Sequence, residues 1–197
     1  IKKSFICINN MGLWEEYFKK IKSSEIIAID TETTSLNINK AKLVGFSIGW
    51  SNEAIYVPLD HDEKIPELDI DVLLKNLKEI CESNKIKKIG QNLKYDYEIL
   101  YRHNIILKNI YFDTLLASFV LDSGNNKHNL DFLAKKYFDY NCISFEDLAG
   151  KGVKQKTFNQ IEINRAYIYA AEDAYITYKL YEVLLDRLEQ DPVSKKI

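Results

Sequence analysis

Residues 25–34 have the sequence EIIAIDTETT, in which a short apolar run leads directly into two acids. The β-branched residues of this run predict a buried strand. Side chains two apart on a strand lie on one face, roughly 6.5–7 Å apart, so Asp30 and Glu32 should point the same way. A divalent ion with oxygen ligands would relieve their repulsion. Taken alone, the pair is explained more simply as a solvated strand end that caps the next segment.

The flanking patterns predict one mixed-sheet α/β domain over residues 1–197. Before and after the acidic run, alternation or short apolar stretches predict further strands over residues 4–8, 43–50, 54–59, 87–90 and up to Asp113. The 43–50 and 54–59 strands should form a hairpin. Apolar residues at helical spacing predict helices over residues 13–21, 70–80 and 93–103. A polar loop is expected over about 141–159, followed by the longest helix from about Ile161. Three antiparallel strands thus precede alternating helices and strands, and helices flank the sheet.

Composition narrows the class of protein. Hydrophobic residues make up 46% of the chain and charged residues 28%, as in an ordinary globular protein, and no apolar run approaches the roughly 20 residues that cross a bilayer. Three widely spaced cysteines predict neither zinc nor disulfides, which indicates a reducing, intracellular compartment. A net charge of −2 argues against a protein that grips many phosphates, but it allows an enzyme whose metal ions supply positive charge.

A second acidic position follows a tyrosine in the segment 169–174, YAAEDA. Residues four apart share a helix face, so Tyr169 and Asp173 should lie together. The small alanines allow this helix to approach other backbone closely. Chain chemistry leaves both Glu172 and Asp173 open as the functional acid, and the position facing Tyr169 favours Asp173. The alternative is that the tyrosine packs in the core and Asp173 is solvated.

A third acidic position occurs in the segment 90–96, GQNLKYD. Gly90 ends a predicted strand and Asn92 can cap the next helix. Asp96 lies in the first turns of that helix, where the helix dipole favours a carboxylate. This structural explanation is complete without any catalytic role.

The order of the three motifs along the chain is stronger evidence for a function than any one motif alone. Asp-x-Glu, Asn-x-x-x-Asp and Tyr-x-x-x-Asp resemble the three exonuclease motifs of the DEDD superfamily, in its tyrosine branch. The resemblance extends to the 3′-5′ proofreading domain of bacterial-type, family A DNA polymerase I through residues 112–114, 145–152 and 157–161. It implies a ribonuclease H-like fold and an enzyme that removes nucleotides from the 3′ end of single-stranded or frayed DNA.

The same resemblance implies a two-metal site for Mg²⁺, with Mn²⁺ as an alternative. Asp30, Glu32 and Asp173 would ligate one ion, and Asp30 would bridge to a second ion that Asp96 holds through water. Tyr169 would orient the attacking water, and 5′-monophosphates would be released. A polymerase domain is expected C-terminal to this segment, in the bacterial cytoplasm or a DNA-containing organelle and not in a membrane. The absence of an initiator Met is consistent with a piece of a longer polypeptide.

The resemblance also implies contacts with the substrate. Against the terminal bases it places Leu36 and Phe145, and along the phosphates it places Gln91, Asn92, Tyr95 and Lys127. Core packing explains Leu36 equally well, and Lys127 stands where Arg is expected, which loses a bidentate contact. Lys151, Lys154 and Lys156 are either further phosphate contacts or a solvated face. Asp113 is expected to cap a helix, and no catalytic role is expected for His61, His103 or His128.

Two other functions fit the same residues. One is a ribonuclease D-like enzyme that trims RNA, because the motifs do not reveal the sugar preference. The other is a non-catalytic module that binds DNA or supports a polymerase, although all five motif positions are intact here.

Overall fold

The strand that carries Asp30 and Glu32 is longer than the apolar run predicts. In the computed structural model, which describes residues 4–191, β2 spans Ile26–Thr33 and both acids lie inside it. Through residues 28–33 β2 pairs antiparallel with β3 (Leu43–Trp50), which places Asp30 opposite Ser47 and Glu32 opposite Gly45. On its other side β2 pairs with β5 (Lys87–Gly90) only through residues 26–28. The acidic half of β2 therefore has one free edge.

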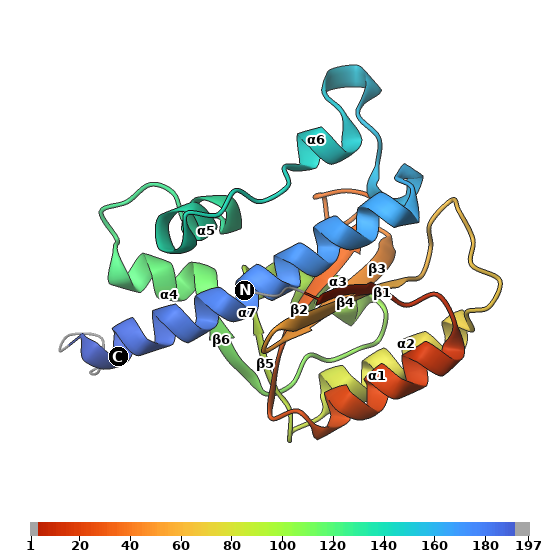
Figure 1. Cartoon of the computed structure of the whole chain (residues 1–197), viewed down its shortest axis with the longest axis horizontal. Coiled ribbons are helices and arrows are strands. Elements are labelled where there is room, and N and C mark those ends of the chain that lie inside the picture. The colour runs from red at the N-terminus through yellow and green to blue at the C-terminus, as the bar shows by residue number, and fades with distance from the viewer. Residues whose placement is uncertain (1–3, 192–197) are drawn as a thin grey trace.

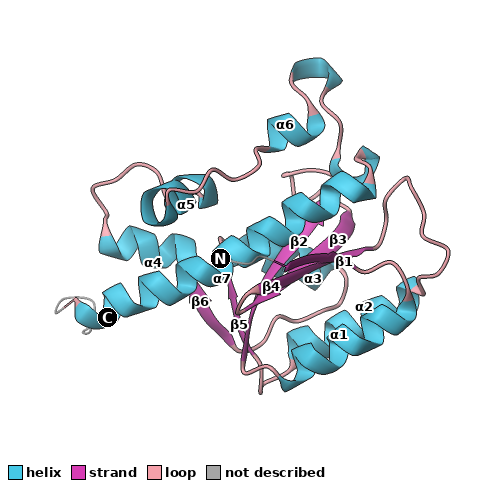
Figure 2. Ribbon diagram, in the orientation of Figure 1, coloured by secondary structure: helices cyan, strands magenta, loops and turns pink. Residues whose placement is uncertain are grey.

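Six strands form one mixed sheet in the order β1-β4-β3-β2-β5-β6 (Figure 2). The antiparallel centre is β2, β3 and β4 (Glu53–Pro58). Parallel strands extend it on both sides: β1 (Ser4–Cys7) pairs with β4, and β6 (Ile110–Asp113) pairs with β5. This arrangement confirms the predicted α/β class with three antiparallel strands.

Alternation along β2 separates the core from the site. Ile27 and Ile29 are buried in a cluster with the helices α1 (Met11–Ser23), α2 (Ile70–Glu82) and α3 (Leu93–Arg102). Since neighbouring side chains on a strand point to opposite faces, Asp30 and Glu32 point to the other face. That face is crossed by α7 (Ile163–Gln190), a 28-residue helix that confirms the predicted long C-terminal helix (Figure 1).

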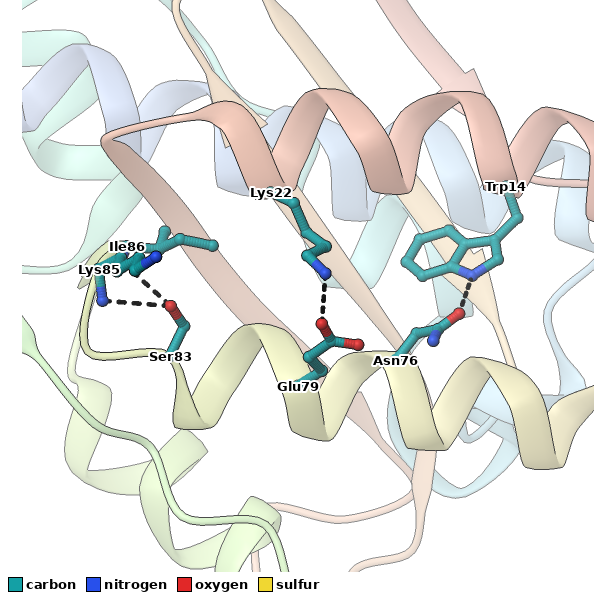
Figure 3. A network of polar contacts seen from close by, with 7 residues as sticks. All are labelled: Trp14, Lys22, Asn76, Glu79, Ser83, Lys85 and Ile86. Carbon is teal, nitrogen blue, oxygen red and sulfur yellow. Dashed lines mark hydrogen bonds and ion pairs between the residues drawn. The ribbon is translucent and has the colours of Figure 1, made fainter.

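The first two helices pack side by side and support the core face (Figure 3). The Trp14 indole N–H donates to Asn76 Oδ1 at 2.9 Å, and Lys22 forms an ion pair with Glu79. Just after α2, the Ser83 hydroxyl accepts the backbone N–H groups of residues 85 and 86. These contacts join α1 and α2 in the layer that packs on the core face of the sheet, opposite to the acids of β2.

Close packing fixes α7 on the opposite face. A Cβ atom at Gly49 of β3 would lie 2.5 Å from the carbonyl oxygen of Ala174, so only glycine allows this approach. Ala170 and Ala171 are also fully buried. The predicted role of the small residues is confirmed, and their packing sets the distance between the acids of β2 and those of α7.

The remaining helices surround this frame. They are α4 (Thr114–Leu121), α5 (Leu130–Phe138) and α6 (Phe145–Ala149), with 3₁₀ turns at Gly152–Lys154 and Phe158–Gln160. The expected loop over 141–159 is thus partly helical: Ser144 caps α6, and Thr157 with Gln160 forms a capping box. Segments this short show no helical periodicity. None of the helices between residues 4 and 191 has the length and apolar character that a membrane crossing requires.

Candidate active site

Three carboxylates converge where α7 crosses the sheet. Asp30 and Glu32 from β2 and Asp173 from α7 each offer an oxygen within 4.8 Å of the other two. The two motifs lie about 140 residues apart in sequence and meet because α7 packs over the β2–β3 pair. The structure thus brings together three of the four predicted metal ligands.

The pKa values of these carboxyl groups show how unfavourable the cluster is without a cation. Burial raises the pKa of Asp30 well above its ordinary value, and repulsion from Asp96, Glu32 and Asp173 adds to this. The pKa of Glu32 is raised by burial and then by Asp173 and Asp96. Burial is also the main reason that the pKa of Asp173 is raised, while a hydrogen bond from Tyr169 opposes the increase.

The donor set fits a hard divalent ion. All the converging ligand atoms are carboxylate oxygens, which suit Mg²⁺ and tolerate Mn²⁺. Glu32 Oε1 is buried and has no hydrogen-bond partner in the part of the chain that the structure describes. An unpaired buried oxygen of this kind is costly, and a bound cation would satisfy it.

Asp96 lies beside these three carboxylates but is not one of the acids whose oxygens approach one another within 4.8 Å. Its side chain is 2% exposed, and Oδ1 accepts the Thr31 backbone N–H at 2.9 Å and the Thr31 hydroxyl at 2.6 Å. Burial raises the pKa of Asp96 to about 7, although the Thr31 bonds oppose the increase. Thr31 can make the backbone bond because β5 does not pair with this part of β2. Its role was not predicted, since the partner is 65 residues away.

The two adjacent acids of α7 have different surroundings. Glu172 accepts hydrogen bonds from the Tyr140 hydroxyl and, at 2.7 Å, from the Ile143 backbone N–H. It therefore ties the segment before α6 to α7, and Asp173 is the acid that joins Asp30 and Glu32 in the carboxylate cluster. Burial, followed by the charges of Asp173 and the β2 acids, raises the pKa of Tyr169 far above its ordinary value, so its hydroxyl stays protonated.

A cavity of about 510 Å³ opens at the cluster. Besides the three carboxylates, Tyr169 and the loop after β2, it is lined by Leu36, Tyr95, Phe145 and residues 155–158. Leu36 is 90% exposed, so core packing does not explain it. Phe145 packs edge-on against Tyr169, with ring centroids 6.1 Å apart. Of the three loop lysines, Lys156 lines the cavity, whereas Lys151 pairs with Glu146.

The other predicted substrate residues lie around this cavity or beyond it. The Tyr95 hydroxyl donates to the Ser35 carbonyl at 2.8 Å and so holds the loop after β2. Gln91 donates to the His128 carbonyl at 2.8 Å and also bonds Thr114. These bonds anchor both side chains, and their contacts with phosphate stay predictions.

Lys127 is exposed and does not line the 510 Å³ cavity at the acidic cluster, which we call the catalytic cavity. It lines a separate pocket beside Asp131 and Lys135. Its predicted contact with phosphate stays a prediction.

The predicted cap at Asn92 is wrong. Asn92 precedes α3 with φ 60° and makes no capping bond with its side chain. Asp113 instead accepts the backbone N–H groups of Asn92 at 3.1 Å and Leu93 at 2.8 Å, and it also caps α4 through Leu115 at 2.9 Å. Asp113 was predicted to cap a helix, and it caps two. The Asn92 side chain is left exposed, and its contact with phosphate stays a prediction.

His61 and His128 have structural partners within the fold. His61 bonds the Tyr56 hydroxyl and a backbone carbonyl, and His128 bonds Ser118. His103 follows α3 as its C-cap residue. None of the three lines the catalytic cavity.

An acidic cluster between a mixed sheet and a crossing helix defines a DEDD-type nuclease fold. Residues 5–189 match a family described as 3′-5′ exonuclease, that of family A DNA polymerases. The chain belongs to this family, as its motifs predicted.

Curated relatives support the assignment. DNA polymerase I of Pseudomonas aeruginosa is 45% identical over 189 residues, which cover 93% of this chain and 21% of the relative. DNA polymerase I of Borreliella burgdorferi is 36% identical over 182 residues, covering 92% and 19%. The chain therefore spans about a fifth of the length of these relatives.

Solved structures show the same fold at low identity. Brucella melitensis NrnC with bound Mg²⁺ is 21% identical with a TM-score of 0.68, and the match covers 100% of this chain and 86% of NrnC. The catalytic core of RRP6 from Trypanosoma brucei is 14% identical with a TM-score of 0.70, covering 95% and 48%.

Proposed function

We propose that residues 1–197 form a single proofreading exonuclease domain, which removes nucleotides from the 3′ end of single-stranded or frayed DNA. The observation that carries this proposal is that Asp30, Glu32 and Asp173 converge at one cavity. The wall of this cavity also includes the exposed side chain of Leu36 and the half-buried ring of Phe145. The acids suit metal-assisted hydrolysis, and the apolar side chains suit unstacked bases.

The acidic residues would hold two divalent ions, Mg²⁺ or Mn²⁺. Asp30, Glu32 and Asp173 would hold one ion, and Asp30 would share the second with Asp96, which acts through water. When bound, the ions supply charge neutralisation at the phosphate and make water a better nucleophile near neutral pH. Asp96 is suited to an indirect role because Thr31 already occupies one of its oxygens twice.

The protein's own groups would orient the attacking water. Tyr169 stays protonated, so its hydroxyl can hold the water but cannot act as a base. Glu32 has a carboxylate oxygen without a protein partner in residues 4–191 and can accept from the same water. Attack at the terminal phosphodiester would release a 5′-monophosphate and leave a new 3′ hydroxyl.

Substrate binding would rely on few contacts. Leu36 and Phe145 would pack on the terminal bases without reading their sequence. Along the backbone the contacts would come from Tyr95, Gln91, Asn92 and Lys127. A net charge of −2 agrees with this short footprint, because the metal ions would provide the positive charge at the reacting phosphate.

The relatives suggest the larger setting. They are named DNA polymerase I, and this chain matches about a fifth of their length. We infer that a polymerase domain is the functional partner, that it follows this domain, and that both work on DNA inside the cell. In that setting the domain would receive primer ends that fray after misincorporation.

Digestion of 3′-labelled primers tests the proposal. We expect Mg²⁺-dependent release of 5′-monophosphates, faster from mismatched than from paired ends, and no release with chelator or with Asp30→Ala. Matched single-stranded RNA is the comparison for sugar preference. RNA cleavage more than an order of magnitude faster than DNA cleavage would favour the RNA-trimming function, and no turnover under any metal condition would favour a non-catalytic module.

A further inference from the structure

A buried tyrosine lies behind Glu32 on the face of the sheet that α7 covers. Across the sheet, Asp30 is opposite Ser47, which is opposite Tyr56 of β4, so all three side chains share that face. Tyr56 is fully buried and packs with residues of α7. None of the roles described so far uses it.

The Tyr56 hydroxyl occupies the position across the strand from Glu32. Glu32 is opposite Gly45, and opposing Cβ atoms in an antiparallel pair lie roughly 4.5–5.5 Å apart. A Cβ atom added to Gly45 would lie 2.1 Å from the Tyr56 hydroxyl oxygen. The hydroxyl therefore fills the space that a side chain at position 45 would take, directly beside the Glu32 side chain.

His61 holds this hydroxyl in place. The Tyr56 oxygen lies 2.7 Å from His61 Nε2, and His61 Nδ1 lies 3.2 Å from the Ile161 carbonyl oxygen. Since a carbonyl can only accept, Nδ1 carries the proton, and Nε2 of the neutral ring accepts from Tyr56. Phe158, a residue of the catalytic cavity, packs against both rings.

We propose that Tyr56, anchored by His61, is a positioning residue that holds the Glu32 carboxylate toward Asp30 and Asp173. The ring and hydroxyl close the space behind Glu32, so this carboxylate has fewer orientations in which it turns away from the metal ligands. The proposal rests on the metal site proposed above. Groups hydrogen-bonded to a metal ligand commonly change metal affinity by 10- to 100-fold when they are removed, and we expect the lower end of this range for a group that acts on Glu32 by packing.

Mn²⁺ binding to the DNA-free protein, measured by electron paramagnetic resonance, provides the test. Tyr56→Phe keeps the packed ring and removes the hydroxyl, and we expect the Mn²⁺ dissociation constant to rise about tenfold. Turnover should recover toward that of the native protein at saturating metal. Tyr17→Phe is the matched control, because Tyr17 is also buried but lies on α1 against the opposite face of the sheet, and its Mn²⁺ affinity should not change.

Gly45→Ala provides a second variant with Tyr56 intact. Its methyl group would displace the hydroxyl, so the same loss of Mn²⁺ affinity is expected. Circular dichroism establishes that each variant is folded before its affinity is compared. Native affinity in both folded variants would overturn the positioning role, and so would an equal loss in Tyr17→Phe.

Asp30→Asn separates this proposal from the one on which it rests. If the native protein binds Mn²⁺, Asp30→Asn does not, and both Tyr56→Phe and Gly45→Ala bind normally, only the positioning role is wrong. If the native protein binds no Mn²⁺, the metal site itself is wrong.

Discussion

Asp96→Asn should stabilise the protein when no metal is bound. The substitution preserves the size of the side chain, and an amide oxygen can still accept both bonds from Thr31. It removes only the negative charge. Asp96 is 2% exposed, and its charge is close enough to Asp30 and Glu32 to raise their pKa values.

The magnitude follows from the pKa of Asp96, which is about 7 in the fold against an ordinary value of 3.8. Each pKa unit corresponds to about 1.4 kcal/mol, so this difference of about 3 pKa units means that the ionised carboxylate lowers the free energy of unfolding by about 4 kcal/mol. Between pH 4 and 7 the folded state binds more protons than the unfolded state, so the free energy of unfolding falls as pH rises. Asp96→Asn should therefore match the native protein near pH 4 and exceed it by up to about 4 kcal/mol at pH 8.

Urea unfolding in chelator at pH 4 and pH 8 measures this difference. Adding Mg²⁺ at 100 times its dissociation constant should reduce this difference by up to about 2.7 kcal/mol, because the ion stabilises the native protein and the variant binds it less well. Equal stability at pH 8 in chelator, or a variant less stable than the native protein, would show that the buried charge does not destabilise the metal-free fold.

Four other substitutions test separate parts of the site. Tyr169→Phe should lower kcat by about 10²-fold with little change in Mn²⁺ affinity, because the role proposed for Tyr169 is to position water and not to hold metal. Timed digestion measures kcat, and metal titration measures the affinity. Glu172→Gln should lower the free energy of unfolding in urea by about 1–3 kcal/mol and retain turnover. Asp173→Asn should abolish turnover while the protein stays folded. The opposite pattern would make Asp173 the structural acid and Glu172 the functional one. Leu36→Ala should leave stability within about 0.5 kcal/mol, since the side chain is 90% exposed, yet raise KM for single-stranded DNA several-fold, and an unchanged KM would remove it from the binding surface.

Periodicity was sufficient to predict the frame of the site. The apolar run of β2 and the long amphipathic pattern of α7 are local features, and each assigns a face to its acids. That the two faces meet is not local, because it depends on strand order and on the close approach at Gly49. The order of the motifs supplied this information through the family resemblance.

Contacts between distant segments could not be predicted in the same way. Spacing from Tyr169 favours Asp173 over Glu172, but only the folded position of Tyr140 shows what Glu172 does instead. Thr31 lies between two predicted ligands, yet its bonds to Asp96 depend on where β5 stops pairing with β2.

Asn92 shows how a local rule for helix capping can fail. Its position before α3 favours a cap, but its backbone is left-handed, a conformation that asparagine adopts more readily than most residues. Asp113, 21 residues away, satisfies the N–H groups that Asn92 would have capped. Because a distant carboxylate caps the helix, the Asn92 side chain is not used as a cap and stays exposed. The local rule fails here because the fold assigns the capping bonds to a residue that is distant in sequence.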